Sequence, residues 1–376
     1  MSDLKVQADD IAVGKALPWP MFDSEGRLLL KKGTVIEKQS MLEALVSRGL
    51  YRRKKDAVST SADEEQVAPF EEQASPLSIL DELIHKLPEI FEQIIARQGN
   101  VEKKIMKLVA SIQGLCEQDA DAMIGAVHIQ RTTQYIYYHP VHVAVLSELV
   151  GKRLGMSEQE RALVLAAALV SNISMLELQD QLYKQEKPLT PEQQQAITQH
   201  PSESVKLLVA NRVYNAKLLE IVMQHHERPD GNGYPGGLKG EMVCREAQLV
   251  SIADRYAAMV SGREYRNAKP SSEALKQFFQ DRCAHCDEAM TLLFIKDLGI
   301  WPPGTPVKLV NGEVAIVTHR IKDSMWPKVN SIISPRGGPY ARPLVRDCEL
   351  EEYRIKEVTR LKEGIPLNLS MLWGYC

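Results

Sequence analysis

The sequence predicts a mainly α-helical protein with a small mixed N-terminal domain and a C-terminal β-hairpin extension. Apolar residues recur at helical spacing between Leu77 and Leu298, and the pattern changes to that of strands after Gly299. Before Leu77 lies a segment poor in apolar residues. With 376 residues and 44% hydrophobic content, the chain can form one full-sized helical domain and smaller modules.

Four segments follow from these changes in pattern. We predict a small mixed α/β domain over 1–55, a flexible linker over 56–75, a helical domain over 76–300 and a β-rich extension over 301–376. In the first, a turn signal before the apolar run Leu28–Leu30 predicts a strand or hairpin, and residues 39–49 are expected to form an amphipathic helix. The linker is rich in Ser, Ala, Asp, Glu and Gln, and buries too little apolar surface to offset its ordering entropy.

Helix signals recur through residues 76–300. Leu80, Leu83, Ile84 and Leu87 form an apolar stripe that Ile90, Ile94 and Ile95 continue. Capping boxes at Ser157 and Thr190 each predict a helix start, the first helix running to Val170. Further helices are expected near residues 202–209, 216–226, 248–260, 272–279 and 287–298. In the extension, Asn311-Gly312 between two apolar runs predicts a hairpin.

Charge and composition exclude some classes of protein. A formal charge of -3 argues against a nucleic-acid polymer as the partner. We expect no membrane span, because no apolar run approaches roughly 18–20 residues, and Leu163–Val170 is predicted to be a buried helix segment. The six cysteines are scattered and Met1 opens no signal-peptide pattern, so a reduced, cytoplasmic protein is expected.

Two adjacent histidines are the first sign of chemistry. His225 and His226 stand at the end of an apolar predicted helix, where neighbouring positions diverge by about 100°. A lone histidine there would be interpreted as a core residue bonded to a carbonyl. Two, followed by Glu227, Asp230 and a glycine-rich loop to Gly237, favour a functional site.

Residues 225–235 resemble the HHExxDGxGYP signature of the HD-GYP domains, which are cyclic di-GMP phosphodiesterases of the HD superfamily. The resemblance extends in order over roughly residues 127–320. It includes Tyr135–His139, Gln199–Pro201, Ala253–Asp254, Ser261–Arg266 and Gly299–Gly304. It implies a helical fold that holds two or three iron or manganese ions, which activate a hydroxide to attack a phosphodiester.

Carried over to this sequence, the resemblance implies two sets of metal ligands. One metal position keeps His139 and Asp254, and the other keeps His200, His225 and His226. Three histidines can hold one metal with open positions. The number of ions is therefore left open between one iron or manganese ion and none.

The sequence departs from the family at the HD dyad. The family's His, Asp and Lys fall on Ser171, Asn172 and Met175, so no catalytic residue is assigned. A neutral amide bridges two dications poorly, and dications about 3.5–4 Å apart then repel strongly. Tyr135 stands where trinuclear members have a carboxylate, so a third ion is not expected. Hydrolysis is predicted to be weak or absent.

Ligand contacts are expected beside this site. Arg263 and Arg266 match positions at which the family contacts phosphate, and Arg228 and Tyr234 belong to the GYP loop. The alternative is that both arginines of the first pair are solvated or bound to Glu241 or Glu264. His142 faces the site or the surface, and the Cys283 to Cys286 pair is interpreted as chance, since structural zinc needs a second ligand pair.

Three hypotheses remain. The first is a cyclic di-GMP signalling protein that senses the nucleotide or binds partners, with little or no hydrolysis. The second is an active phosphodiesterase that yields pGpG or GMP from a mononuclear site. The third is a nucleotide-independent interaction protein whose partner is another signalling protein, such as a diguanylate cyclase.

Overall fold

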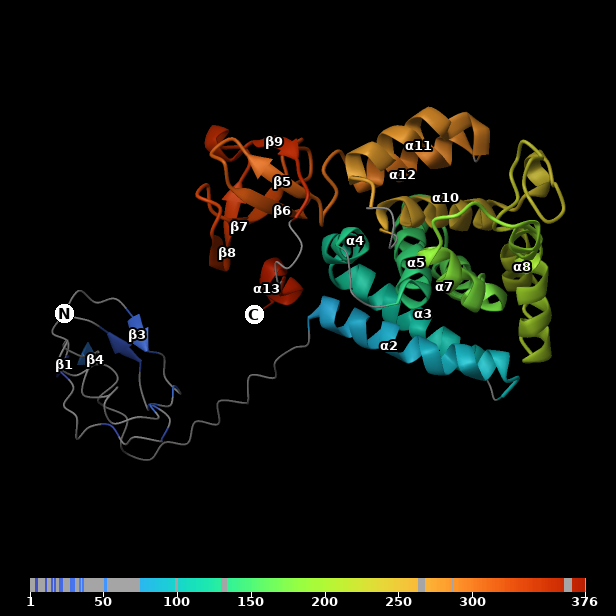
Figure 1. Cartoon of the computed structure of the whole chain (residues 1–376), viewed down its shortest axis with the longest axis horizontal. Helices are drawn as coiled ribbons and strands as arrows, with labels where there is room; N and C mark the ends of the chain where they lie inside the picture. Colours follow the sequence, from blue (N-terminus) through green and yellow to red (C-terminus); the bar gives the residue numbers. More distant parts are fainter. Residues whose placement is uncertain are drawn as a thin grey trace. The chain divides into compact units, whose positions relative to one another are not determined.

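The chain separates into two units, Met1–Glu72 and Gln73–Cys376, each of which is described by itself (Figure 1). The computed structural model describes residues 75–98, 101–129, 134–262, 268–285, 287–361 and 367–375, together with short stretches between residues 4 and 52. The helix expected at 39–49 and nearly all of the expected linker lie outside the described residues.

The N-terminal unit contains a small antiparallel sheet. Its strands are β1 (Leu4–Lys5), β2 (Met21–Phe22), β3 (Leu28–Leu30) and β4 (Tyr51–Arg52), in the order β1-β4-β2-β3. The strand predicted at Leu28–Leu30 is therefore present. Met21 and Phe22 are buried, so β2 supplies apolar side chains to the core of this unit.

The second unit is mainly helical, which confirms the predicted fold class. Its helices are α2 (Pro76–Ile95), α3 (Val101–Gln118), α4 (Ala120–His128), α5 (Tyr135–Arg153), α6 (Glu158–Val170), α7 (Leu176–Lys184), α8 (Pro191–Ala210), α9 (Ala216–Gln224), α10 (Arg245–Val260), α11 (Ser271–His285) and α12 (Glu288–Leu298), with 3-10 turns η3 (Ile173–Met175) and η4 (Gly240–Met242). Helix α5 packs against α6, α10, α3, α2, α4 and α12. Its residues from Tyr138 to Glu148 are all buried, as expected of the central helix of a core.

Local signals set most of the helix boundaries. Both predicted capping boxes form: the Ser157 hydroxyl accepts from the Glu160 N–H and the Glu160 carboxylate accepts from the Ser157 N–H, and Thr190 and Gln193 repeat the pattern. The separate helix expected near 202–209 is wrong, because α8 continues through Pro201. In the stripe of α2, Ile95 is exposed rather than buried, since the helix ends there.

The C-terminal extension is a five-stranded antiparallel sheet. Its strands are β5 (Pro306–Leu309), β6 (Val314–His319), β7 (Lys328–Ile333), β8 (Pro339–Asp347) and β9 (Ile355–Val358), in the order β8-β7-β6-β5-β9. The predicted hairpin is confirmed as β5–β6, with Gly312 at a φ of 90° in its turn. The sheet lies at the α4 and α12 end of the helical domain, and α8 lies at the other end (Figure 1).

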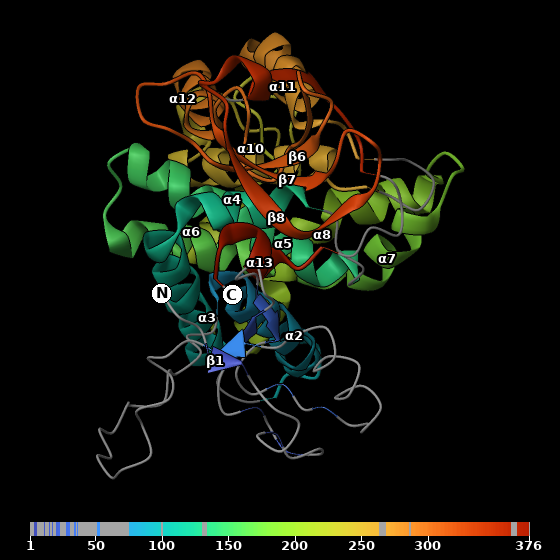
Figure 2. The same ribbon diagram turned by 90° about the vertical axis from the view of Figure 1, so that its left-hand side faces the viewer.

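A short helix that the sequence did not indicate ties the extension to the core. Helix α13 (Leu369–Trp373) contacts both α2 and β8 (Figure 2). The Trp373 ring fills the space beside Gly125 of α4, where a Cβ atom would lie 2.2 Å from it. The Asn330 side chain of β7 donates to the Leu372 carbonyl at 2.5 Å. Glycine at position 125 therefore makes this close contact possible.

The segment Glu158–Lys184 bears on the expectation of no membrane span. Within the described residues it is the one helical segment long and apolar enough to cross a membrane, with a mean hydropathy of 1.6 in its most apolar window. Half of that window is buried inside the protein. The core helix of a soluble protein meets the same criterion, so this segment is weak evidence for a membrane span.

Candidate functional site

The five predicted metal ligands come from three helices and from the turn that follows a fourth, and they meet in one place. His139 lies on α5, His200 on α8 and Asp254 on α10, while His225 and His226 follow the end of α9. The two last histidines were expected on a helix, but α9 ends at Gln224 and His225 is its C-terminal cap. The turn that begins there directs both rings toward His200, with centroid distances of 5.1 and 5.0 Å.

Backbone carbonyls fix the ring orientation of two of these histidines. The His200 Nδ1–H donates to the Ile197 carbonyl at 2.6 Å, and the His225 Nδ1–H donates to the Val222 carbonyl at 2.7 Å. Ile197 would bond to the N–H of residue 201 in a regular helix, but residue 201 is Pro201, which has none. Val222 is among the last residues of α9, whose carbonyls lack helical partners.

Because Nδ1 carries the proton in both rings, Nε2 carries a lone pair in both. The two Nε2 atoms lie 3.1 Å apart, so two lone pairs face each other. One ligand atom from each of His200, His225 and His226 lies within 4.8 Å of the others. This donor set fits a divalent metal ion that accepts imidazole, because a cation between the lone pairs would turn their repulsion into attraction.

Burial keeps these histidines neutral. It lowers the pKa of His200 to about 3, and nearby His225 adds to that shift. Burial also lowers the pKa of His225 and, more strongly, that of His226, on which the charge of His225 acts in the same direction. Asp254 opposes the shift in all three rings. Neutral imidazole is the form that binds a metal, so the trio needs no deprotonation at neutral pH.

His139 and Asp254 form the other half of the site. The His139 Nε2 atom lies 2.8 Å from an Asp254 carboxylate oxygen, and its Nδ1 lies 3.1 Å from the Tyr135 hydroxyl. Burial alone would raise the pKa of Asp254, but the hydrogen bond and charge of His139 hold it well below its usual range. A 2.8 Å separation suits a buried His–Asp hydrogen bond and also two ligands that converge on one ion.

The segment aligned with the dyad joins α6 to η3. The Ser171 hydroxyl is buried and donates back to the Ala167 carbonyl at 2.6 Å. Asn172 is half-buried and is the N-cap residue of η3, but its side chain makes no capping hydrogen bond, and Met175 is the last residue of that turn. None of these three side chains is an anion, so this segment offers no negatively charged bridge.

A hydroxyl network connects this segment to the helix that carries His200. Ser204 of α8 donates to the Ser171 carbonyl at 2.8 Å and lies 3.0 Å from the Ser174 hydroxyl. Ser174 in turn donates to the His200 carbonyl at 2.9 Å. These hydroxyl hydrogen bonds hold the segment against the site although its side chains supply no charge.

Glu227, the third residue of the signature, anchors the GYP loop. Its buried carboxylate accepts from the Gly236 N–H at 2.5 Å and from the Leu238 N–H at 2.9 Å. Gly233 packs directly on the backbone at residue 228, where a Cβ atom would lie 2.3 Å from the Arg228 nitrogen. Glycine is therefore required at position 233 for the loop to fold back on itself.

Two of the four predicted ligand contacts, Tyr234 and Arg228, lie among the described residues. The Tyr234 ring lies 4.8 Å from the His226 ring, so it forms a wall of the histidine site. Arg228 forms an ion pair with Asp230 in the same loop. Arg263 and Arg266, the predicted phosphate contacts, and the side chains of Cys283 and Cys286 lie outside the described residues.

Two groups of aromatic residues were not indicated by the sequence. Tyr183 of α7 stacks on Tyr135 at 5.2 Å, and Tyr135 stacks on His139 at 4.8 Å. His128 bonds to the Tyr256 hydroxyl of α10 at 2.7 Å, and burial lowers the pKa of His128 to about 4.

His142, which the sequence left open between the site and the surface, is buried on α5.

Comparison with known families agrees with this arrangement. Residues 104–290, which include all five predicted ligands, match the family model described as HD domain. This part of the chain belongs to the HD domain family. With the His225–Pro235 signature and curated relatives that are cyclic di-GMP phosphodiesterases, it is of the HD-GYP type.

Several curated proteins are similar to this chain. A cyclic di-GMP phosphodiesterase of Pseudomonas aeruginosa is 26% identical over 230 residues, 61% of this chain and 55% of that protein. The cyclic di-GMP phosphodiesterase response regulator RpfG of Xanthomonas campestris is 34% identical over 136 residues, 36% of each chain. One from Thermotoga maritima is 34% identical over 143 residues, 37% of this chain and 38% of that protein. The chain thus spans about half or less of the length of these relatives.

A solved structure shares the fold. An HDG"Y"P protein from Bdellovibrio bacteriovorus superposes with a TM-score of 0.52 at 17% identity, covering 79% of this chain and 99% of that one. At this identity the likeness concerns the fold alone.

Proposed function

We propose that this protein binds cyclic di-GMP at the HD-GYP site and hydrolyses it weakly or not at all. The observation that carries the proposal is the contrast within the site. Three neutral histidines and a well-anchored GYP loop lie beside a segment in which Ser171 and Asn172 stand where the family resemblance expects a histidine and an anionic aspartate. Relatives named as cyclic di-GMP phosphodiesterases support the choice of ligand.

Residues of this chain would divide the work of binding. His200, His225 and His226 would hold one iron or manganese ion, which when bound would polarise a phosphodiester oxygen and a water molecule. Tyr234 would close the site beside His226, and Arg263 and Arg266 would bind phosphate oxygens through paired donors. The Tyr135 and Tyr183 rings would shield His139 from solvent.

The segment 171–175 offers no anionic side chain to bridge two ions, and this is the reason to expect slow turnover. A second ion at His139 and Asp254 would lie close to the first without a carboxylate shared between them. One ion can orient and polarise the phosphate, but it cannot clamp both the attacking and the leaving oxygen as a pair of ions does.

Metal-dependent turnover is the second candidate function, and the intact histidine trio favours it. A mononuclear site with open positions is a known arrangement for hydrolysis. The first candidate function gives little or no linear product, whereas the second gives it. Both require His226 to bind the ion.

The test is an anaerobic reconstitution with Fe(II) or Mn(II), followed by metal quantification, nucleotide titration and product analysis on one sample. We expect saturable binding of cyclic di-GMP with little linear product. Product that scales with bound metal and vanishes in His226→Ala would establish the second candidate. No binding up to about 0.5 mM nucleotide would remove both and leave a nucleotide-independent interaction role.

A further inference from the structure

A second candidate site lies at the other end of α5 from the histidines. A cleft of about 510 Å³ opens between the helical domain and the loop that joins β6 to β7. Arg153, in the last turn of α5, lines it. His139 lies fourteen residues earlier on the same helix, which corresponds to about 21 Å at 1.5 Å per residue. The cleft is therefore separate from the metal centre.

Ion pairs and hydrogen bonds hold the walls of the cleft in place. The Arg320 Nε–H donates to an Asp121 oxygen at 2.6 Å, and the Arg320 backbone N–H donates to the other Asp121 oxygen at 3.0 Å. Arg320 also donates to the Asp297 carbonyl, and the Arg153 Nε–H donates to the Asp297 carboxylate at 2.7 Å. The loop after β6 is thereby fixed to α4 and α12, and each carboxylate of the cleft is already used.

The remaining charge in the cleft is positive. Four cationic and two carboxylate side chains line it, which leaves a net charge of +2 on a protein whose formal charge is -3. Lys296 and Lys322 are exposed and take part in no ion pair among the described residues. Arg153 uses only its Nε–H in the ion pair, and its side chain is 70% exposed, so its terminal N–H groups remain accessible. These groups suit an anion that carries two negative charges.

Apolar surface lines the same cleft. Ile300 and Met325 are each 63% exposed, which is unusual for side chains of this size, and Trp301 is half-buried beside them. A planar or apolar ligand body would remove this surface from water, at roughly 25 cal/mol for each Å² buried. A volume of about 510 Å³ lies within the range of small-molecule sites.

We infer that this cleft binds a phosphate monoester with a planar body, of the size of a nucleoside monophosphate. The dianionic phosphate contacts Lys296, Lys322 and Arg153, and the planar part lies against Ile300, Trp301 and Met325. The side chains that line the cleft include no carboxylate or amide left free to read the hydrogen-bond pattern of a base. The site therefore selects for charge and shape, and GMP and AMP bind alike.

Calorimetric titration of the full chain with GMP tests the inference. Guanosine lacks the charge and inorganic phosphate lacks the planar body, so each is expected to bind at least about tenfold more weakly than GMP. The double variant Lys296→Ala/Lys322→Ala is expected to weaken GMP binding by at least about tenfold. Lys206→Ala removes an exposed lysine of α8 and is the matched control, with no change expected.

Two further variants localise the binding. Met325→Asp places a negative charge, of the same sign as the phosphate, at an exposed position without disturbing the core. It is expected to weaken GMP binding about tenfold. His226→Ala is expected to leave the affinity for GMP unchanged, because the histidine site is separate. No GMP binding up to about 5 mM, an affinity that the lysine variant does not change, or a loss that occurs in His226→Ala instead would each overturn the inference.

Discussion

The two halves of the candidate metal site differ in the groups that they offer to an ion. In the GYP half, carbonyls orient His200 and His225, and a buried Glu227 anchors the loop. In the dyad half, the Ser171 hydroxyl returns to its own helix and Asn172 carries no charge, although a hydroxyl network still fastens the segment to α8. The difference teaches that the architecture of such a site and its charge are separable: hydrogen bonds from serine hydroxyls to carbonyls hold the segment in place where its side chains carry no negative charge.

The largest expected effect is on the GYP half. His226→Ala removes one of three metal ligands, so metal affinity is expected to fall by about 100-fold or more. Metal content per chain after reconstitution and gel filtration measures this.

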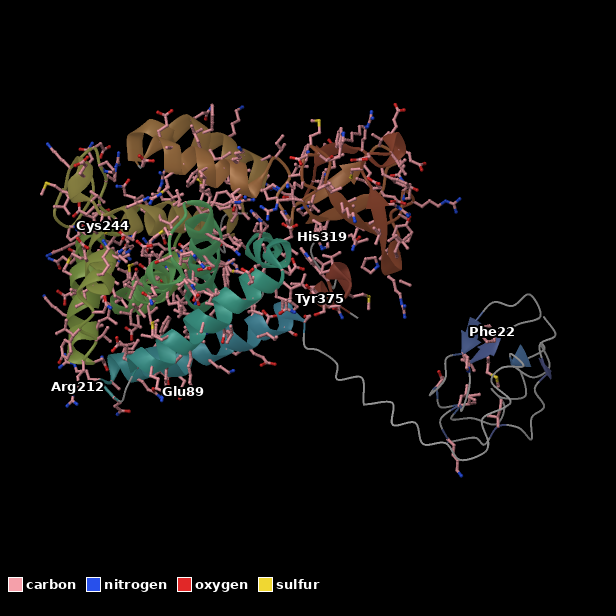
Figure 3. All side chains as sticks on the ribbon, turned by 180° about the vertical axis from the view of Figure 1, so that it is seen from behind. Phe22, Glu89, Arg212, Cys244, His319 and Tyr375 are labelled. Atoms are coloured by element: carbon pink, nitrogen blue, oxygen red, sulfur yellow. The ribbon has the colours of Figure 1, made fainter. Side chains whose placement is uncertain are left out.

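The matched control for His226→Ala is His319→Ala. His319 lies on β6 in the C-terminal extension, well apart from Cys244, which is close in sequence to the GYP loop (Figure 3). Metal content is expected to stay at the wild-type value in this control. Equal metal loss in both variants would mean that the histidine trio does not hold the ion.

The loop geometry can be tested with a pair of glycine substitutions. Gly233→Ala brings a Cβ atom to 2.3 Å from the Arg228 nitrogen, and is expected to destabilise the protein by about 2 kcal/mol and to weaken nucleotide binding. Gly114→Ala, on an exposed face of α3 with no atom within 4 Å, is expected to stabilise it by about 0.5–1 kcal/mol. Thermal unfolding of both variants checks the signs; a Gly233→Ala protein as stable as wild type would contradict the described loop.

Glu313 lies outside the site, and both oxygens of its carboxylate accept hydrogen bonds. It therefore provides a reference for how the stability of the protein depends on acid. Its hydrogen bond to Arg346, with those to Ser331 and Tyr340, lowers the pKa of Glu313 from 4.5 to about 2. Because the folded pKa is depressed, this stabilisation is complete above about pH 4.5 and is lost as the pH falls toward 2. We expect about 2 kcal/mol of such loss.

The Glu313→Gln variant should flatten that dependence. Unfolding free energies at pH 6 and pH 3 measure it, and Ser171→Ala serves as a control that should keep the wild-type slope. A Glu313→Gln variant with an unchanged slope would show that other carboxylates control the acid sensitivity.

In the dyad half the expected effect is a gain. Ser171→His with Asn172→Asp restores an anionic bridge, and is expected to raise metal content toward two ions and turnover by about tenfold. Ser171→His alone lacks the bridge and should gain little. If wild type and the double variant turn over equally fast, the substituted dyad is not what limits hydrolysis.

Much of the site could be predicted from the sequence because its motifs are local. The Thr190 capping box starts α8, and the Pro201 that follows His200 frees the carbonyl that orients that ring. The five ligands could be named because the HD-GYP resemblance gives their order. The end of α9 was misplaced by two residues, since an apolar pattern does not mark where a helix stops.

Contacts between distant segments could not be predicted. Trp373 meets Gly125 across 248 positions, and Tyr183 reaches Tyr135 from a helix whose packing no short motif encodes. The Ser171–Ser204 network joins the end of α6 to the interior of α8, and these two positions meet only in the folded chain. Each of these contacts depends on the tertiary fold, which the local pattern constrains only loosely.

The most direct test of the central claim is a single-turnover measurement with metal-loaded wild-type protein in excess over cyclic di-GMP. We predict that the wild-type protein binds the nucleotide and that the nucleotide is recovered largely intact. The Ser171→His/Asn172→Asp protein is expected to convert it to linear product. Rapid conversion by the wild-type protein, lost in His226→Ala, would contradict the claim and show that the GYP half is sufficient for hydrolysis.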